Sequence, residues 1–312
     1  MRGGGSWVVA GLLGALLAGQ WLLPAYHHAN MVRIMVLAVY ATGYNLAFGY
    51  TGLLSLGHAL FFAAGLYAAG FAATLADQPA MVALIAGPLA GGLMAAAVGV
   101  LALRTVGVAF MIVTLMFAQS GYLTILALGR WTRGDEGLVI PQAARLLAGF
   151  DLSDDRVRYP VALVLFGCGL LGCLWLVRSR FGRVMVAMRE NPERARMLGF
   201  DPFAVRLAAL TVSGCYAGAA GAAQAILFGY AGASLASVQY SILPLLWVLL
   251  GGAGTVAGPF VGCCLMFYLI DYASGVTSAT LLVVGAALVG LTLFAPKGIL
   301  GTLRDRGATW LP

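Results

Sequence analysis

Charged residues are scarce in this chain. They make up only 9% of its 312 residues, and 62% of the residues are hydrophobic. Soluble domains usually carry about 25% charged residues. So few charges exclude an ordinary soluble domain, and the composition predicts an integral membrane protein.

Residues that carry chemistry are also few. No Gly-rich loop is followed by the Lys-Ser/Thr pair of a nucleotide site, and no His-Glu-x-x-His helix or Ser/His/Asp constellation occurs. The five Cys lie in apolar segments without metal-ligand spacing to His. No basic run with interleaved aromatic residues suggests nucleic acid. We therefore expect a non-enzyme with packing thiols that binds no metal or cofactor itself.

Long apolar runs dominate what is present. A membrane-spanning helix needs about 20 apolar residues, and ten candidate segments occur along the chain. They are 7–24, 31–49, 58–76, 80–103, 106–128, 159–178, 204–229, 238–251, 258–272 and 279–295. The segments 238–251 and 258–272 are short, so they either span or re-enter the membrane. The N-terminal segment, 7–24, could be a secretory signal, but it is long enough to be a retained membrane helix, which we favour. The prediction is one all-α membrane domain, 1–312.

The orientation follows from the distribution of positive charge. With the N-terminus inside and ten crossings, the inner side holds twelve cations and four acids, and the outer side six cations and seven acids. Cytoplasmic loops carry the excess of Lys and Arg. We therefore expect both termini in the cytoplasm and an external loop at 129–158. That loop is either a contact for an external partner or a plain solvated connector.

A basic island at 178–206 interrupts the apolar segments with seven Arg and three acids. So much charge cannot lie in hydrocarbon. Asn191 before Pro192 is a strong helix start, and Gly199 is a natural helix end. These signals predict a short helix at 192–198 within a cytoplasmic loop, 179–203. Together with Met185, Met188, Met197 and Leu198, this helix could insert into a groove on another protein; otherwise the loop only balances charge.

Two glycine-rich interruptions fall within apolar stretches, at 49–58 and 251–259. Broken helices of this kind mark binding sites in transporters, and a freed helix end can offer N–H groups to a carboxylate. For His58 the sequence leaves two interpretations, a pathway residue or a His satisfied by neighbouring backbone, and the second is slightly favoured. For the second interruption, a pathway and close helix packing are equally supported. Asp271 is more simply explained by a position at the outer interface than by a role inside the membrane.

Three sequence blocks together resemble one family. The island matches the pattern S-x-F-G-R-x-x-x-A-x-R-E-N-x-x-x-A-x-x-L-G, which is typical of membrane subunits of branched-chain amino acid ABC importers. Residues 44–70 resemble the family's N-L-x-x-G-Y-x-G-x-x-S-L-G-H block. Residues 249–262 resemble its G-G-x-G-T-x-x-G-P-x-x-G block. The blocks cover about a quarter of the chain in the expected order.

The resemblance implies a multi-pass permease subunit of the bacterial inner membrane, surrounded by lipid. It implies a second homologous permease subunit, two cytoplasmic ATPase subunits that bind ATP-Mg, and an extracytoplasmic substrate-binding protein. The coupling residues it implies are Phe181, Gly182, Arg183, Arg189, Glu190, Asn191, Ala195, Leu198 and Gly199. The substrate-pathway residues it implies are Asn45, Tyr50, Thr51, Gly52, Ser55, Gly57, His58, Gly252, Gly254 and Thr255.

The substrate stays open at this point. Branched-chain amino acids are favoured, and the same permease class also carries urea or short amides and small aromatic acids. An ion-coupled secondary transporter is a weaker alternative, because such proteins usually place acids within the membrane, and this chain has almost none there.

Overall fold

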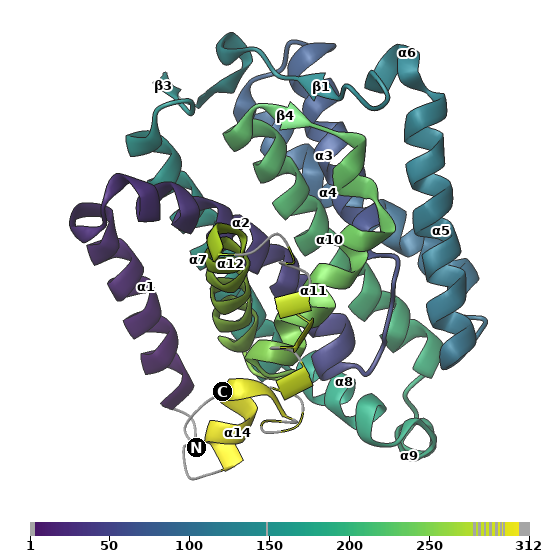
Figure 1. Cartoon of the computed structure of the whole chain (residues 1–312). Coiled ribbons are helices and arrows are strands. Elements are labelled where there is room, and N and C mark those ends of the chain that lie inside the picture. Colours follow the sequence, from purple (N-terminus) through teal and green to yellow (C-terminus); the bar gives the residue numbers. More distant parts are fainter. Residues whose placement is uncertain are drawn as a thin grey trace.

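The computed structural model describes residues 4–147, 149–276 and 297–305, together with isolated positions between 279 and 295. Within these residues the chain folds as an all-α bundle with two minimal sheets (Figure 1). The apolar helices are α1 (Gly4–Leu22), α2 (Ala25–Asn45), α3 (His58–Thr74), α4 (Ala80–Ala102), α5 (Val108–Ala127), α7 (Asp155–Arg178), α10 (Pro202–Phe228), α11 (Val238–Gly251) and α12 (Gly258–Val276).

Six of the helices are long and apolar enough to cross a membrane, with α2 extended by the π-helical turn η1 (Leu46–Tyr50). The apolar parts of α1, α3 and α11 are shorter. Nine of the ten predicted segments therefore coincide with helices. The tenth, 279–295, lies largely outside the described residues. The helices α8 (Arg180–Glu190), α9 (Pro192–Met197) and α14 (Gly298–Asp305) lie at the same end of the bundle as the start of α1 (Figure 1). We call this end, which holds the basic island, the basic end.

Glycine allows three helices to pack with their backbones in contact. A Cβ added to Gly218 of α10 would overlap the carbonyl of Gly87 and lie 2.9 Å from the Cα of Gly91, both on α4. A Cβ added to Gly65 of α3 would overlap the backbone of Gly218. Small residues at helix contacts are typical where lipid supplies no hydrophobic drive for association. The α3–α4–α10 unit is therefore held by close approach.

Helix α3 begins inside the bundle rather than at its end. His58 Nε2 contacts Ser213 Oγ at 2.8 Å, and that hydroxyl donates to the carbonyl of Gly43 at 2.7 Å. Gly43 lies six residues before Gly49, or about 9 Å along a helix with a rise of 1.5 Å per residue. Residues 51–57 therefore run back from the basic end into the bundle in non-helical conformation.

Helix α11 begins at the depth at which α3 begins. The hydroxyl of Ser241 accepts from the N–H of Ala59 at 2.9 Å, and Tyr40 donates to the carbonyl of Tyr240 at 3.2 Å. From there α11 descends to Gly251, where a Cβ would overlap the carbonyl of Gly258 in α12. The short segment 238–251 is thus a half-length helix in a tight hairpin with α12, in line with a re-entrant element.

The opposite end of the bundle is closed by the loop 129–158. It contains α6 (Gly129–Thr132), β1 (Leu138–Val139), η2 (Gln142–Arg145), β2 (Leu146–Leu147) and β3 (Phe150–Asp151), and β1 pairs with β4 (Tyr230–Ala231). Here the Arg145 guanidinium donates to the carbonyls of Ile226 and Leu227. These carbonyls belong to the last turn of α10, which has no hydrogen-bond donors of its own for them. Hydrogen bonds from Gln142 and from the Ser153 N–H hold the pKa of the Asp151 carboxyl below its usual value. The loop is therefore an ordered cap.

Candidate functional site

The island folds as two short helices with the predicted caps. Ser179 Oγ accepts from the N–H of Gly182 at 3.2 Å and begins α8, and Asn191 Oδ1 accepts from the N–H of Arg194 at 3.0 Å and begins α9. Pro192 is the first residue of α9, and Gly199 follows its end with φ 87°. These observations confirm the predicted short helix, which ends at Met197 with Leu198 as its cap.

The two helices expose different residues from those expected. Met185 and Met188 are buried in the protein's own core, so the prediction that they are available to another protein was wrong. Their spacing of three puts them on one helix face, and that face packs onto the bundle. Met197 and Leu198 are 85% and 75% exposed. Within the island, the most exposed apolar side chains therefore lie at the end of α9.

The predicted coupling residues divide between the interior and the surface. Gly182 and Ala195 are buried, and Phe181 and Asn191 are half-buried. A Cβ on Gly182 would overlap the carbonyl of Val177, so the turn between α7 and α8 has no room for a side chain there. The exposed members are Arg183, Arg189, Glu190, Leu198 and Gly199, although the guanidinium of Arg189 is directed onto the protein.

Both glycine interruptions meet at the basic end. The Asn45 side chain donates to the carbonyl of Thr255 at 2.9 Å and accepts from the N–H of Gly254 at 2.9 Å. The guanidinium of Arg189 donates to the carbonyl of Gly49. Thus η1, the loop 252–255 and α8 form one contact, which we call the basic-end junction.

The remaining junction residues support these backbone positions. Thr51 donates to the carbonyl of Leu46 at 2.9 Å, and Thr255 donates to that of Gly252 at 2.8 Å. Gly252 has φ 120°, and a Cβ on it would lie 2.8 Å from the N–H nitrogen of Gly301 in α14. Tyr50 is buried beside the junction. Seven of the ten predicted pathway residues therefore gather here: Asn45, Tyr50, Thr51, Gly52, Gly252, Gly254 and Thr255.

Ser55, Gly57 and His58 lie apart from the junction, where α3 begins. The Ser213 hydroxyl donates its proton to the Gly43 carbonyl, so it acts as the acceptor toward His58 Nε2. The neutral His58 ring therefore carries its proton on Nε2. The buried Nδ1 has no hydrogen-bond partner among the described residues. The partner of His58 Nε2 is thus a side chain, Ser213 of α10, rather than neighbouring backbone.

Three N–H groups at and just before the start of α3 are already occupied. The Thr114 hydroxyl accepts from the N–H of Leu56 at 3.1 Å, and the Ser55 hydroxyl accepts from the N–H of Gly57 at 3.2 Å. The Ser241 hydroxyl accepts from the N–H of Ala59. In this conformation they are not free for a carboxylate. Sequence reasoning missed Thr114, Ser213 and Ser241; the available signal was an isolated hydroxyl within an apolar helix.

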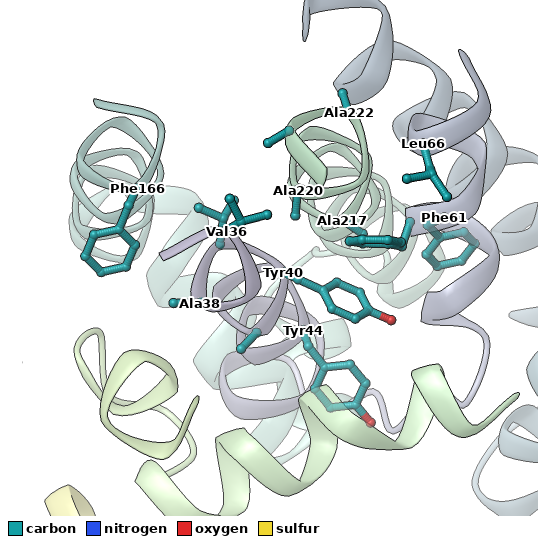
Figure 2. Packing of buried hydrophobic residues seen from close by; sticks show 14 of the residues in the cluster. Val36, Ala38, Tyr40, Tyr44, Phe61, Leu66, Phe166, Ala217, Ala220 and Ala222 are labelled. Atoms are coloured by element: carbon teal, nitrogen blue, oxygen red, sulfur yellow. The ribbon is translucent and has the colours of Figure 1, made fainter. Parts of the chain in front are cut away.

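Aromatic rings surround the start of α3. The rings of Tyr44 and His58 have centroids 4.6 Å apart, and those of Tyr40 and Phe62 5.0 Å apart. Figure 2 shows the rings of Tyr40 and Tyr44 leaving α2 on the same side, toward Phe61 of α3. The Tyr44 hydroxyl is buried without a partner among the described residues. This half-depth region is therefore largely apolar, with a few fixed polar groups.

Helix α5 is the least buried of the six spans. A cleft of about 440 Å³, lined by apolar residues such as Leu60, Met94 and Phe117, separates it from α3 and α4. Gln119 and Ser120, near the middle of α5, are exposed. An amide exposed to lipid acyl chains halfway along a membrane helix is unfavourable. Polar side chains at such positions instead form hydrogen bonds to a neighbouring helix.

Other polar groups do not form a metal centre. No group of three or more His, Cys, Asp or Glu that could hold a metal ion occurs in the described part of the chain. Asp271 is exposed on α12 and accepts from the hydroxyl of Tyr26 near the start of α2. Because α2 starts at the end of the bundle opposite the basic end, Asp271 lies toward that opposite end.

Comparisons with known proteins agree with the motifs. Residues 28–294 match a family described as the permease component of branched-chain amino acid transport systems. The chain is 29% identical over 300 residues to the high-affinity branched-chain amino acid transport system permease protein LivM of Escherichia coli K12, covering 87% of this chain and 69% of that protein. The corresponding protein of Salmonella typhimurium LT2 is 28% identical with the same coverage.

A more distant likeness covers a smaller part. The autoinducer 2 import system permease protein LsrC of Escherichia coli HS is 31% identical over 117 residues, which is 32% of this chain and 34% of that protein. No solved structure matches the chain significantly.

Proposed function

The chain belongs to the family of permease components of branched-chain amino acid transport systems and is a multi-pass protein of the bacterial inner membrane, and from this premise we propose that it is one half of the pore of an ABC importer. Two separate cytoplasmic ATPase subunits bind ATP-Mg and drive it, and an extracytoplasmic binding protein delivers the solute. This chain binds no cofactor itself. The basic end is the cytoplasmic end in this proposal.

One observation carries the proposal. Helix α9 projects Met197 and Leu198 from the basic end, and α8 connects it directly to η1 and the loop 252–255. A short helix with an exposed apolar end and surrounding Arg has the features of a surface that docks into a groove on another protein. The connection to the membrane helices gives such docking a route to the pore.

The proposed solute is a branched-chain amino acid. The relatives aligned over most of the chain are branched-chain amino acid permeases by name. The interior at half depth is mostly aromatic and aliphatic, with neutral His, Ser and Tyr groups. That lining suits a small apolar zwitterion better than a strongly charged solute. Short amides and small aromatic acids are the alternatives that a binding assay on the delivering protein would separate.

Docking is tested by charge at the end of α9. The double substitution Met197→Asp with Leu198→Asp places two carboxylates on the proposed contact, and we expect association with the ATPases to weaken by about 2 kcal/mol or more, roughly thirtyfold. The measurement is co-purification of the ATPases with the permease from membranes. Phe150→Asp, a similar change at an exposed site of the opposite end, should leave co-purification intact. Equal recovery of ATPase with both variants would contradict the docking assignment.

The second permease subunit is proposed to pack on the outward face of α5. That face carries Gln119 beside Met116 and Leu123, which are 63% and 53% exposed. A photo-crosslinking amino acid at 119 or 123 should form an adduct with the second permease subunit in the intact complex. The same probe at Leu93, 72% exposed on α4, is the control and should not. Adducts from position 93 but not from 119 or 123 would assign the interface to a different face.

A further inference from the structure

We propose that Arg189 is the residue that transmits movement of α8 to the membrane helices, so that Gly49, Gly52 and Gly254 belong to the coupling machinery rather than to the lining of the solute pathway. This inference rests on the proposed function, because it names the link between the ATPase-facing helices and the pore.

Three glycines surround the Arg189 side chain. A Cβ on Gly52 would lie 3.2 Å from its Cγ, and a Cβ on Gly254 would lie 3.2 Å from its Nη1. Gly49 supplies the carbonyl that accepts its hydrogen bond. Contacts near 3.2 Å are tighter than ordinary van der Waals packing. A side chain at Gly52 or Gly254 would therefore press on Arg189, and both glycines have φ 76°, a conformation that other residues rarely adopt.

Asn45 makes the two loops behave as one body. Its amide holds the backbone of both Gly254 and Thr255, and a Cβ on Gly49 would overlap its Oδ1. A displacement of Arg189 that moves the Gly49 carbonyl therefore also acts on the loop 252–255. That loop ends α11 and precedes α12, so one side chain of α8 is connected to three membrane helices.

The turn held by Arg189 is a π-helical turn. It spans Leu46–Tyr50. At its end Gly52 donates to the carbonyl of Phe48 at 3.0 Å and Leu53 donates to that of Ala47 at 2.8 Å, so these two bonds close the helix. π-turns occur frequently at functional sites because they contain one residue more than an α-helical turn, and a change of register can move that residue along the helix. The segment that follows, 51–57, leads directly to His58 and α3.

The guanidinium has no competing ionic partner. In the part of the chain that the structure describes, no carboxylate is in ion-pair contact with Arg189, although Glu190 is its neighbour in sequence. A backbone carbonyl is therefore its principal acceptor. Substitution by Lys keeps the charge but loses the planar geometry that lets Arg reach the carbonyl between two loops.

The test uses the complete importer, with both permease subunits, the ATPases and the delivering protein, reconstituted in proteoliposomes. The variants are Arg189→Gln, Arg189→Lys and Gly254→Ala, with Arg180→Gln as a control that removes one exposed positive charge from the same helix. For each, the solute transported per ATP hydrolysed, the KM for solute and the amount of co-purified ATPase are measured.

For the three variants we expect transport per ATP to fall at least tenfold, with KM and co-purified ATPase within twofold of wild type. Arg180→Gln should match wild type in all three quantities. The double variant Arg189→Gln with Gly254→Ala should be no more than twofold worse than the worse single variant, because both changes break one link. Unchanged transport per ATP, or a raised KM as its main effect, would overturn the role in coupling. Absence of ATP-driven transport by the wild-type complex would instead refute the proposed function.

Discussion

Gly218→Leu is expected to prevent stable folding of the membrane bundle. The new side chain would have to occupy the space taken by the backbones of Gly87, Gly91 and Gly65. Inserting methylenes into a well-packed core costs about 1–3 kcal/mol where side chains can yield, and here only backbone can move. We expect a loss of more than about 3 kcal/mol, or roughly 6–12 °C in the apparent melting temperature of the purified protein, with much less protein in membranes.

The matched control is Gly14→Leu. Gly14 lies in α1, and no heavy atom lies within 4 Å of the position of its added Cβ. The same change of side chain there should leave the melting temperature within about 2 °C, in keeping with surface substitutions elsewhere. If both variants melt like the wild type, the close approach of α3, α4 and α10 is not what holds the bundle together.

Replacing residues 191–199 by a Gly-Ser linker of the same length is expected to abolish transport while leaving the membrane bundle intact. The replaced segment contains α9 with its Asn191 cap, and its apolar side chains Met197 and Leu198 are exposed rather than part of the core. A flexible linker cannot present a fixed helix to a groove. Transport and solute-stimulated ATP hydrolysis should both fall to background, measured in proteoliposomes beside the melting temperature of the purified permease.

A Gly-Ser linker of matching length in place of residues 75–79, the exposed loop between α3 and α4, serves as the control for chain flexibility. This loop lies at the opposite end of the bundle. The importer that carries this variant should keep a measurable rate of solute-stimulated ATP hydrolysis. Transport at the wild-type rate after loss of α9 would refute the ABC permease assignment itself, since the driving subunits would then have no need of this helix.

Much of the helical layout was predictable because its signals are local. Asn191, Pro192 and Gly199 predicted α9 to within one residue, and Ser179 precedes α8. Apolar length predicted nine helices among the described residues.

The candidate site was harder to predict. Met185 and Met188 looked available because an apolar residue in a basic loop has no partner within sequence reach, yet the bundle covers both. The predicted pathway residues between 45 and 58 are close in sequence but lie in two places, at the basic-end junction and at the start of α3. The hydroxyls that meet the start of α3 come from three other helices: Thr114 and Ser241 accept from backbone N–H groups and Ser213 accepts from the His58 ring, so no spacing rule could find them.

The sequence by itself determined that this is a membrane permease, roughly where nine of its apolar helices lie, and which family it belongs to, because hydropathy, capping and motifs act over a few residues. Only the tertiary structure decided that Arg189 meets Gly49, 140 positions away, and that Asn45 meets Gly254, 209 positions away. Such contacts depend on how glycines let whole helices approach. They place the charge of the island on the glycine loops and so connect the surface of the protein to its membrane interior.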